Sequence, residues 1–129
     1  MKTIKVVAAV IIQDELVLAT QRSYGDYKGK WEFPGGKIEN NETKEEALIR
    51  EIKEELSVDI KVNKHYLTVE YQYPDFYLEM DCYLCDITRG SIKLTVHSNL
   101  AWTHIDDLEK LDWLEADKPI ISLIKSQYY

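Results

Sequence analysis

Residues 36–58, GKIENNETKEEALIREIKEELSV, carry both the clearest helix of the chain and its most informative chemistry. A helix is predicted over residues 43–56 because Thr43 and Glu46 form a capping box, in which each side chain can bind the other's backbone N–H. Apolar residues recur at helical spacing behind this cap and are expected to face the core: Leu48, Ile49, Ile52 and Leu56.

Three carboxylates stand together near the end of this predicted helix. Glu51, Glu54 and Glu55 are spaced i, i+3 and i+4, so a helix brings them onto one face. Their mutual repulsion is offset only in part by Arg50 and Lys53. A group of hard oxygen donors on a rigid element suits Mg²⁺ or Mn²⁺. A solvated acidic face is the commoner meaning of such charges, and the three glutamates alone do not decide against it.

The residues around the carboxylates favour the metal site. Gly35 and Gly36 permit a tight turn with exposed backbone carbonyls just before the helix, and Glu42 adds an acid at the helix entrance. The full pattern is Gly36, five residues, Glu42, seven residues, and then REIKEELSV at residues 50–58.

This pattern resembles the Nudix box, G-x5-E-x7-R-E-U-x-E-E-x-G-U, where U is a bulky aliphatic residue. Every defined position matches except Ser57, which stands where the family has glycine. Fixed residues at such long spacing are far more specific than a short glycine motif. The glycine at this position follows the helix in a left-handed conformation, which costs serine about 1 kcal/mol.

The likeness extends over nearly the whole chain. Residues 31–39, WEFPGGKIE, look like the segment that opens the box in the MutT-like branch, which includes 8-oxo-dGTP diphosphatase and CTP pyrophosphohydrolase. Gln21-Arg22, Trp102 and residues 116–119 are also similar to that branch. The resemblance implies an α/β (α+β) Nudix fold, a mixed β-sheet sandwiched between helices, in a single domain over residues 1–129.

The resemblance also implies roles for the residues of the box. Glu51, Glu54 and Glu55, with a carbonyl of Gly35 or Gly36, would hold Mg²⁺, or Mn²⁺ in its place. Metal coordination lowers the pKa of water and screens the substrate's phosphates, so that attack at phosphorus releases a nucleoside monophosphate and pyrophosphate. Catalytic roles are expected for Glu51, Glu54 and Arg50, with Arg50 orienting a neighbouring carboxylate through a charge-assisted hydrogen bond.

The sequence leaves open which residue is the general base. Many relatives carry a loop glutamate before the late strand, and Val96 aligns with it here. The base would then be Glu51 or Glu54, or else His97, whose unperturbed pKa suits the task. The alternative for His97 is a loop histidine that packs near Trp102.

Four residues are predicted to bind substrate: Arg22, Phe33, Lys37 and Asp117. Arg22 is either a phosphate contact or an exposed loop arginine. Asp117 lies where MutT-like enzymes read the base, and it could equally cap the final helix, with Pro119 in its first turn. An aspartate there suits the donor edge of cytosine or adenine, or an oxidised purine if the aspartate is protonated.

The rest of the chain reads as strands and a final helix. Strands are predicted at residues 3–13, 16–20, 31–33, 59–73, 76–88, 92–96 and 100–103, from their β-branched and aromatic content and turn signals. A helical segment is expected from Asp106 and a helix over residues 118–126. Cys82 and Cys85 read as ordinary strand residues on opposite faces, because no second cysteine pair completes a zinc site.

The composition and net charge of the chain limit the kinds of partner that it can bind. The 129 residues carry a net charge of −7 with no basic block, which argues against polymeric nucleic acid. An acidic chain can still bind a polyphosphate when metal ions supply positive charge. No stretch approaches membrane-spanning length, so a cytoplasmic location is expected. The protein is also expected to be a monomer or a homodimer.

Three functions follow. The first is a Mg²⁺-dependent nucleoside triphosphate pyrophosphohydrolase acting on 8-oxo-dGTP or a cytidine triphosphate. The second is hydrolysis of another nucleoside diphosphate derivative. The third is a nucleotide-sensing Nudix module without catalysis. The box glutamates, all retained here, argue against this third function.

Overall fold

The computed structural model describes residues 2–94 and 97–128, without the side chains of residues 97 and 98. Its elements follow in the order β1 (Lys2–Gln13), β2 (Leu16–Arg22), β3 (Trp31–Glu32), β4 (Gly35–Lys37), α1 (Lys44–Leu56), β5 (Asp59–Gln72), β6 (Phe76–Arg89), β7 (His97–His104), two 3₁₀ helices (Ile105–Lys110 and Glu115–Asp117) and α2 (Lys118–Tyr128).

Strand β1 is the centre of a mixed sheet. It runs parallel to β6 and antiparallel to β2 and β4. Strand β5 pairs with β6 on one side, while β3 and β7 both pair with β2 on the other. The mixed sheet predicted from the sequence is therefore confirmed.

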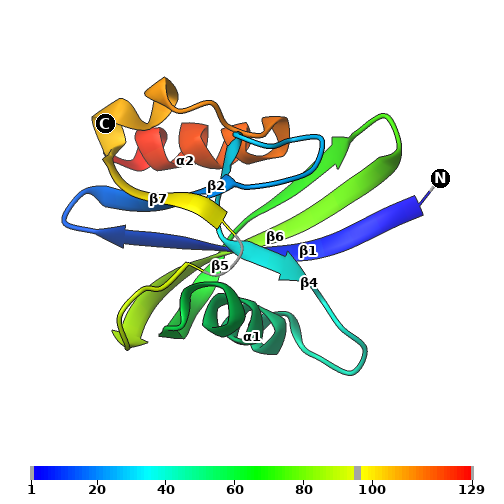
Figure 1. Cartoon of the computed structure of the whole chain (residues 1–129), viewed down its shortest axis with the longest axis horizontal. Coiled ribbons are helices and arrows are strands. Elements are labelled where there is room, and N and C mark those ends of the chain that lie inside the picture. The colour runs from blue at the N-terminus through cyan, green and yellow to red at the C-terminus, as the bar shows by residue number, and fades with distance from the viewer. Residues whose placement is uncertain (1, 95–96, 129) are drawn as a thin grey trace.

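A helix covers each face of this sheet, with α2 above and α1 below in the view of Figure 1. Successive residues of β1 point to opposite faces. Val7, Ala9 and Ile11 pack with α1, whereas Ala8 and Val10 pack on the side of α2. The sandwich has two hydrophobic cores, one under each helix.

Helix α1 begins and ends as its sequence predicts. The N–H of Glu46 donates to Thr43 Oγ1 at 3.1 Å, and the N–H of Thr43 donates to Glu46 Oε1 at 2.8 Å, which completes the capping box. Ser57 ends the helix at φ 62° and ψ 28°, and its N–H donates to the Lys53 carbonyl. The left-handed serine is confirmed.

Several predicted details are wrong. Ile49 is 41% exposed, because the apolar stripe follows Leu48, Ile52 and Leu56 and Ile49 lies about 100° around the helix. Residues 92–94 form no strand, and residues 95–96 lie outside the described part. The short helical segment expected from Asp106 is confirmed: it is a 3₁₀ helix that begins one residue earlier, at Ile105.

The remaining expectations concern the cysteines and the membrane. Cys82 and Cys85 are free and buried, and they belong to the two different cores, as their spacing predicts. Across residues 2–94 and 97–128, the helices are too short and too polar to span a bilayer.

Candidate active site

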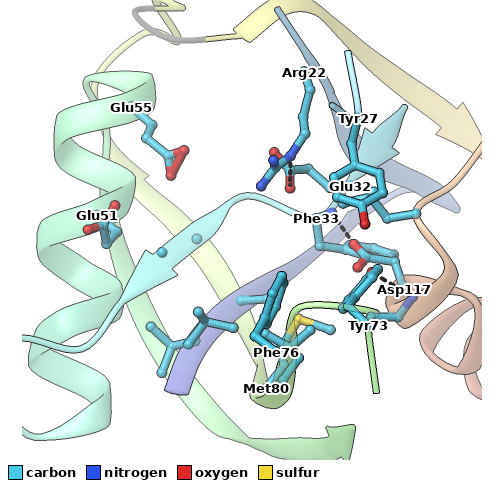
Figure 2. Close-up of a pocket in the computed structure, with 18 of the residues that line it drawn as sticks. Arg22, Tyr27, Glu32, Phe33, Glu51, Glu55, Tyr73, Phe76, Met80 and Asp117 are labelled. Carbon is cyan, nitrogen blue, oxygen red and sulfur yellow. Dashed lines mark hydrogen bonds and ion pairs between the residues drawn. The ribbon is translucent and has the colours of Figure 1, made fainter. Parts of the chain in front are cut away.

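A cavity of about 490 Å³ opens between α1 and the loops at one end of the sheet (Figure 2). Its walls come from α1, β3, β4, the middle of β1, the loop after β2, the turn between β5 and β6 with the first residues of β6, and the segment before α2. One end is acidic and is formed by Glu51, Glu54 and Glu55. The other end is aromatic and holds Asp117. All three predicted metal ligands on α1 therefore face the same cavity.

Gly35 and Gly36 do not form the tight turn expected from the sequence. They lie in the short strand β4, paired with Ala8 and Val7 of β1, and neither has a positive φ. Their lack of a side chain matters for contact instead. A Cβ on Gly35 would lie 1.9 Å from the Val7 carbonyl oxygen, and one on Gly36 would lie 2.3 Å from the Glu51 carboxyl. The glycines let β4 pass between β1 and the acidic face of α1.

Arg50 joins α1 to the loop that precedes it. Its Nε and Nη2 donate to the two carboxylate oxygens of Glu42 at 2.7 and 2.9 Å, and Nη2 also donates to the Lys37 carbonyl at 3.1 Å. Its Nη1 donates to Glu51 at 2.8 Å and to Glu54 at 3.3 Å. The hydrogen bonds from Arg50 hold the pKa of Glu42 at about 2. One guanidinium thus orients carboxylates on both sides of the helix entrance.

Glu55 is the most buried carboxylate of the acidic end, at 8% exposure. Burial raises its pKa to about 8, and the charges of Glu51 and Glu32 add to this, while a hydrogen bond from the Gly35 N–H opposes it. A divalent cation would relieve this unfavourable concentration of negative charge.

The carboxylates are not gathered into a finished ligand set. Among the residues described, no three His, Cys, Asp or Glu side chains are arranged to hold a metal ion. Glu51 and Glu54 instead accept hydrogen bonds from Arg50. The oxygen donors, their shared cavity and the buried Glu55 nevertheless fit Mg²⁺ or Mn²⁺, which prefer such ligands.

An ion pair occupies the middle of the cavity. Arg22 Nε lies 3.1 Å from Glu32 Oε1, and the pair stands between Glu55 and Asp117 in Figure 2. The Thr20 hydroxyl donates to the Glu32 carbonyl at 3.1 Å, which fixes β3 beside β2. Arg22 therefore lines the cavity and has a carboxylate partner, while its side chain is 42% exposed.

Asp117 is buried at the aromatic end, at 4% exposure. Its Oδ2 accepts the N–H of Phe33 at 2.8 Å, and the Phe33 ring stacks on Trp113 with centroids 4.9 Å apart. Burial raises the pKa of Asp117 to about 8, against the lowering effect of the Phe33 hydrogen bond. Helix α2 begins directly after Asp117 and has Pro119 in its first turn, as predicted.

An aromatic group forms the wall beside Asp117. Tyr73 packs edge-on against Tyr27 at 5.5 Å and stacks with Phe76 at 5.0 Å between ring centroids. The Ala116 N–H donates to the Tyr73 hydroxyl at 3.4 Å. These rings give the cavity a flat, apolar compartment next to a single buried acid.

Not every predicted residue reaches the cavity. Lys37 is exposed and does not line it, although its carbonyl binds Arg50. Val96 and the His97 side chain lie outside the described residues, so their roles stay predictions. Conversely, Glu32 and Tyr73 were not anticipated. A charged residue in a short strand, three positions before two glycines, is a usable signal for Glu32, but a strand tyrosine such as Tyr73 most often means core.

Comparison with known proteins finds relatives that match most of the chain. The NUDIX domain profile matches residues 6–123. CTP pyrophosphohydrolase of Escherichia coli (strain K12) is 30% identical over 94% of this chain and 90% of its own length. An 8-oxo-dGTP diphosphatase of Proteus vulgaris is 38% identical over 69% of this chain and 80% of its own length. The solved structure of MutT from methicillin-resistant Staphylococcus aureus 252 has a TM-score of 0.77 and 38% identity, and covers 98% of this chain and 99% of that one.

Proposed function

This chain belongs to the Nudix hydrolase family, and from that premise we propose that it hydrolyses a nucleoside triphosphate to a nucleoside monophosphate and pyrophosphate with Mg²⁺. The observation that carries the proposal is the single cavity that joins a carboxylate-rich helix face to an aromatic compartment ending at Asp117. A polyphosphate suits the first end once a cation is present, and a nucleobase suits the second.

The carboxylates of α1 would hold the ion. Glu51, Glu54 and Glu55 offer oxygens toward the cavity, and the backbone of β4 passes directly beside Glu51. Bound there, Mg²⁺ lowers the pKa of water and screens phosphate charge. Arg50 keeps Glu51 and Glu54 oriented, and whichever of these two carboxylates faces the attacking water accepts its proton.

Arg22 would bind the phosphates between the two ends. Its Nε is engaged by Glu32, so its guanidinium is oriented at the cavity wall before substrate arrives. A guanidinium can bind phosphate oxygens in a bidentate manner, which an ammonium cannot.

Asp117 supports 8-oxo-dGTP as the first candidate substrate. With its pKa raised to about 8, the side chain is a neutral acid at pH 7, and it can both donate and accept a hydrogen bond as an amide does. This dual capacity suits an oxidised guanine. A cytidine triphosphate is the second candidate, favoured by the likeness to CTP pyrophosphohydrolase. The ionised form of Asp117 would accept from the cytosine amino group more strongly than the neutral acid does.

The test is pyrophosphate release with Mg²⁺ over ribo- and deoxynucleoside triphosphates, including 8-oxo-dGTP. Wild type should turn over one or two of them, and Glu54→Gln should lower kcat by at least a hundredfold. Asp117→Asn should keep 8-oxo-dGTP activity within about tenfold while Asp117→Ala loses it, because only the amide preserves both hydrogen-bonding roles. Binding without turnover of any triphosphate would replace the proposal with a sensing module.

A further inference from the structure

Asp81 is a buried carboxylate that the proposed reaction does not use. It lies in β6 at 6% exposure and does not line the cavity. Its Oδ1 accepts from Thr68 Oγ1 at 2.6 Å and contacts His65 Nε2 at 3.1 Å, both from β5. Its Oδ2 lies 2.8 Å from Nζ of Lys44, the first residue of α1. The side chains of β5 therefore hold the Asp81 carboxylate of β6 in place, and this carboxylate forms an ion pair with Lys44 at the start of α1.

The hydrogen-bond partners indicate that this cluster accepts a hydrogen bond from Lys44 and does not activate Thr68 as a nucleophile. The Thr68 hydroxyl donates its only hydrogen to Asp81, so its oxygen accepts from His65 Nε2 at 2.8 Å. His65 Nε2 therefore carries a hydrogen and cannot take the Thr68 proton. Both strand side chains polarise the carboxylate and fix its orientation toward α1.

The place of Asp81 in the sheet connects it to the acidic end of the cavity. Val7 of β1 pairs with Asp81 on one side and with Gly36 on the other, so the three residues form one row across the sheet. Gly36 in turn lies against Glu51. Lys44 and Glu51 of α1 thus rest on the two ends of the same row, and the Tyr83 hydroxyl adds a hydrogen bond to Glu45 in the first turn.

We propose that Asp81 is a positioning residue which, through Lys44, fixes the first turn of α1 and so the place of its carboxylates relative to β4. The inference rests on the proposed function, because it matters for catalysis only if Glu51, Glu54 and Glu55 hold the ion. Displacing catalytic groups by about 1 Å lowers rates by up to a hundredfold, although nothing at the reacting atoms has been removed.

Asp81→Asn tests the contact with little other disturbance. The asparagine retains Oδ1 for Thr68 and His65, and it replaces Oδ2 with an amide group that cannot accept from Lys44. We expect kcat to fall about tenfold, the Mg²⁺ concentration for half-maximal activity to rise several-fold, and KM for the nucleotide to stay within twofold. Amide hydrogen exchange should quicken across residues 44–51.

Lys44→Met is the reciprocal variant, because it leaves every strand side chain in place. It should reproduce the kinetic changes of Asp81→Asn, and the double variant should show no further loss. Glu79→Gln is the matched control. It removes the Lys5–Glu79 pair at 3.9 Å, two residues away on the same strand and with Glu79 more exposed, and it should leave all four readouts unchanged.

The outcomes separate this inference from the proposed function. Unchanged kcat, Mg²⁺ dependence and exchange in both variants would overturn the positioning role, and so would equal losses in Glu79→Gln. If Asp81→Asn does not fold, Lys44→Met decides alone. If wild type cleaves none of the triphosphates, the proposed function fails. Exchange across residues 44–51 and stabilisation by Mg²⁺ then still show whether Asp81 fixes the helix.

Discussion

At the scale of single residues, the cavity contains two buried carboxyl groups with raised pKa values and different expected uses. Burial is the first cause for both Glu55 and Asp117, and each pKa lies at about 8. Glu55 has further carboxylates beside it, so a cation is the partner that stabilises it. Asp117 has a backbone N–H and aromatic rings beside it, so a neutral, hydrogen-bonding acid is favoured there. The surroundings, and not the residue type, separate the two roles.

Asp117 should make stability depend on pH. Its pKa is about 8 in the folded protein against a reference value of 3.8, so the folded state holds a proton that the unfolded state releases between these values. The free energy of unfolding therefore falls as pH rises from about 4 to about 8. Asp117→Asn should flatten this decline and raise the melting temperature by several degrees at pH 9, but not at pH 4. Parallel melting curves for both proteins from pH 4 to 9 would contradict the assignment.

The left-handed backbone conformation of Ser57 lowers the stability of the protein, and a single substitution can remove this cost. Its φ of 62° places a side chain in the left-handed region, where glycine is favoured by about 1 kcal/mol. We expect Ser57→Gly to raise the unfolding free energy by about that amount in urea titrations, with kcat unchanged. Ser57→Ala keeps the Cβ and serves as the control. A gain in Ser57→Ala equal to that in Ser57→Gly would show that φ is not the cause.

At the scale of elements, β4 and α1 together make the acidic end, and the two glycines of β4 serve different purposes. A Cβ on Gly35 would meet backbone atoms of β1, which cannot move without breaking the strand pairing. The atoms nearest to a Cβ on Gly36 belong to the carboxyl end of the Glu51 side chain, which can rotate away. One glycine therefore maintains the sheet and the other leaves room for a catalytic carboxylate.

This difference leads to opposite phenotypes for the same substitution. Gly35→Ala should destabilise the protein by several kcal/mol, seen as a large fall in melting temperature. Gly36→Ala should lower kcat at least tenfold while the melting temperature changes by only a few degrees, because the strain is relieved by moving Glu51. Steady-state kinetics and thermal melts of the two variants check this. Equal stability losses would indicate that the Glu51 side chain cannot move.

The elements that could be predicted from sequence are those with local signals. The capping box of Thr43 and Glu46 and the spacing of the glutamates define α1 without reference to the rest of the chain. Strand β4 could not be predicted, because Gly35 and Gly36 signal a turn locally and are extended only through pairing with β1. The ion pair of Arg22 and Glu32 likewise depends on the pairing of β2 with β3.

At the scale of the whole molecule, the site lies where separate parts of the sandwich meet. The carboxylates come from the helix on one face of the sheet, whereas Asp117 precedes the helix on the other face. The cavity between them runs past the middle of β1, the paired strand β4 and the turn after β5. A ligand in this cavity would contact both layers, so binding should stabilise the fold as a unit.

Mg²⁺ should therefore raise the melting temperature in a way that depends on Glu55. An ion that binds only the folded state adds about 1.4 kcal/mol at ten times its dissociation constant, which is several degrees for a chain of this size. The melting temperature of Glu55→Gln should differ from that of wild type both without and with Mg²⁺. Without metal at pH 8 it should melt higher than wild type, because a neutral amide replaces a carboxylate whose pKa burial raises to about 8. Mg²⁺ should raise the melting temperature of Glu55→Gln only slightly, so the difference from wild type narrows or changes sign. The control Glu79→Gln should be stabilised by Mg²⁺ as much as wild type is. An equal Mg²⁺ gain in Glu55→Gln and wild type would place the ion away from Glu55.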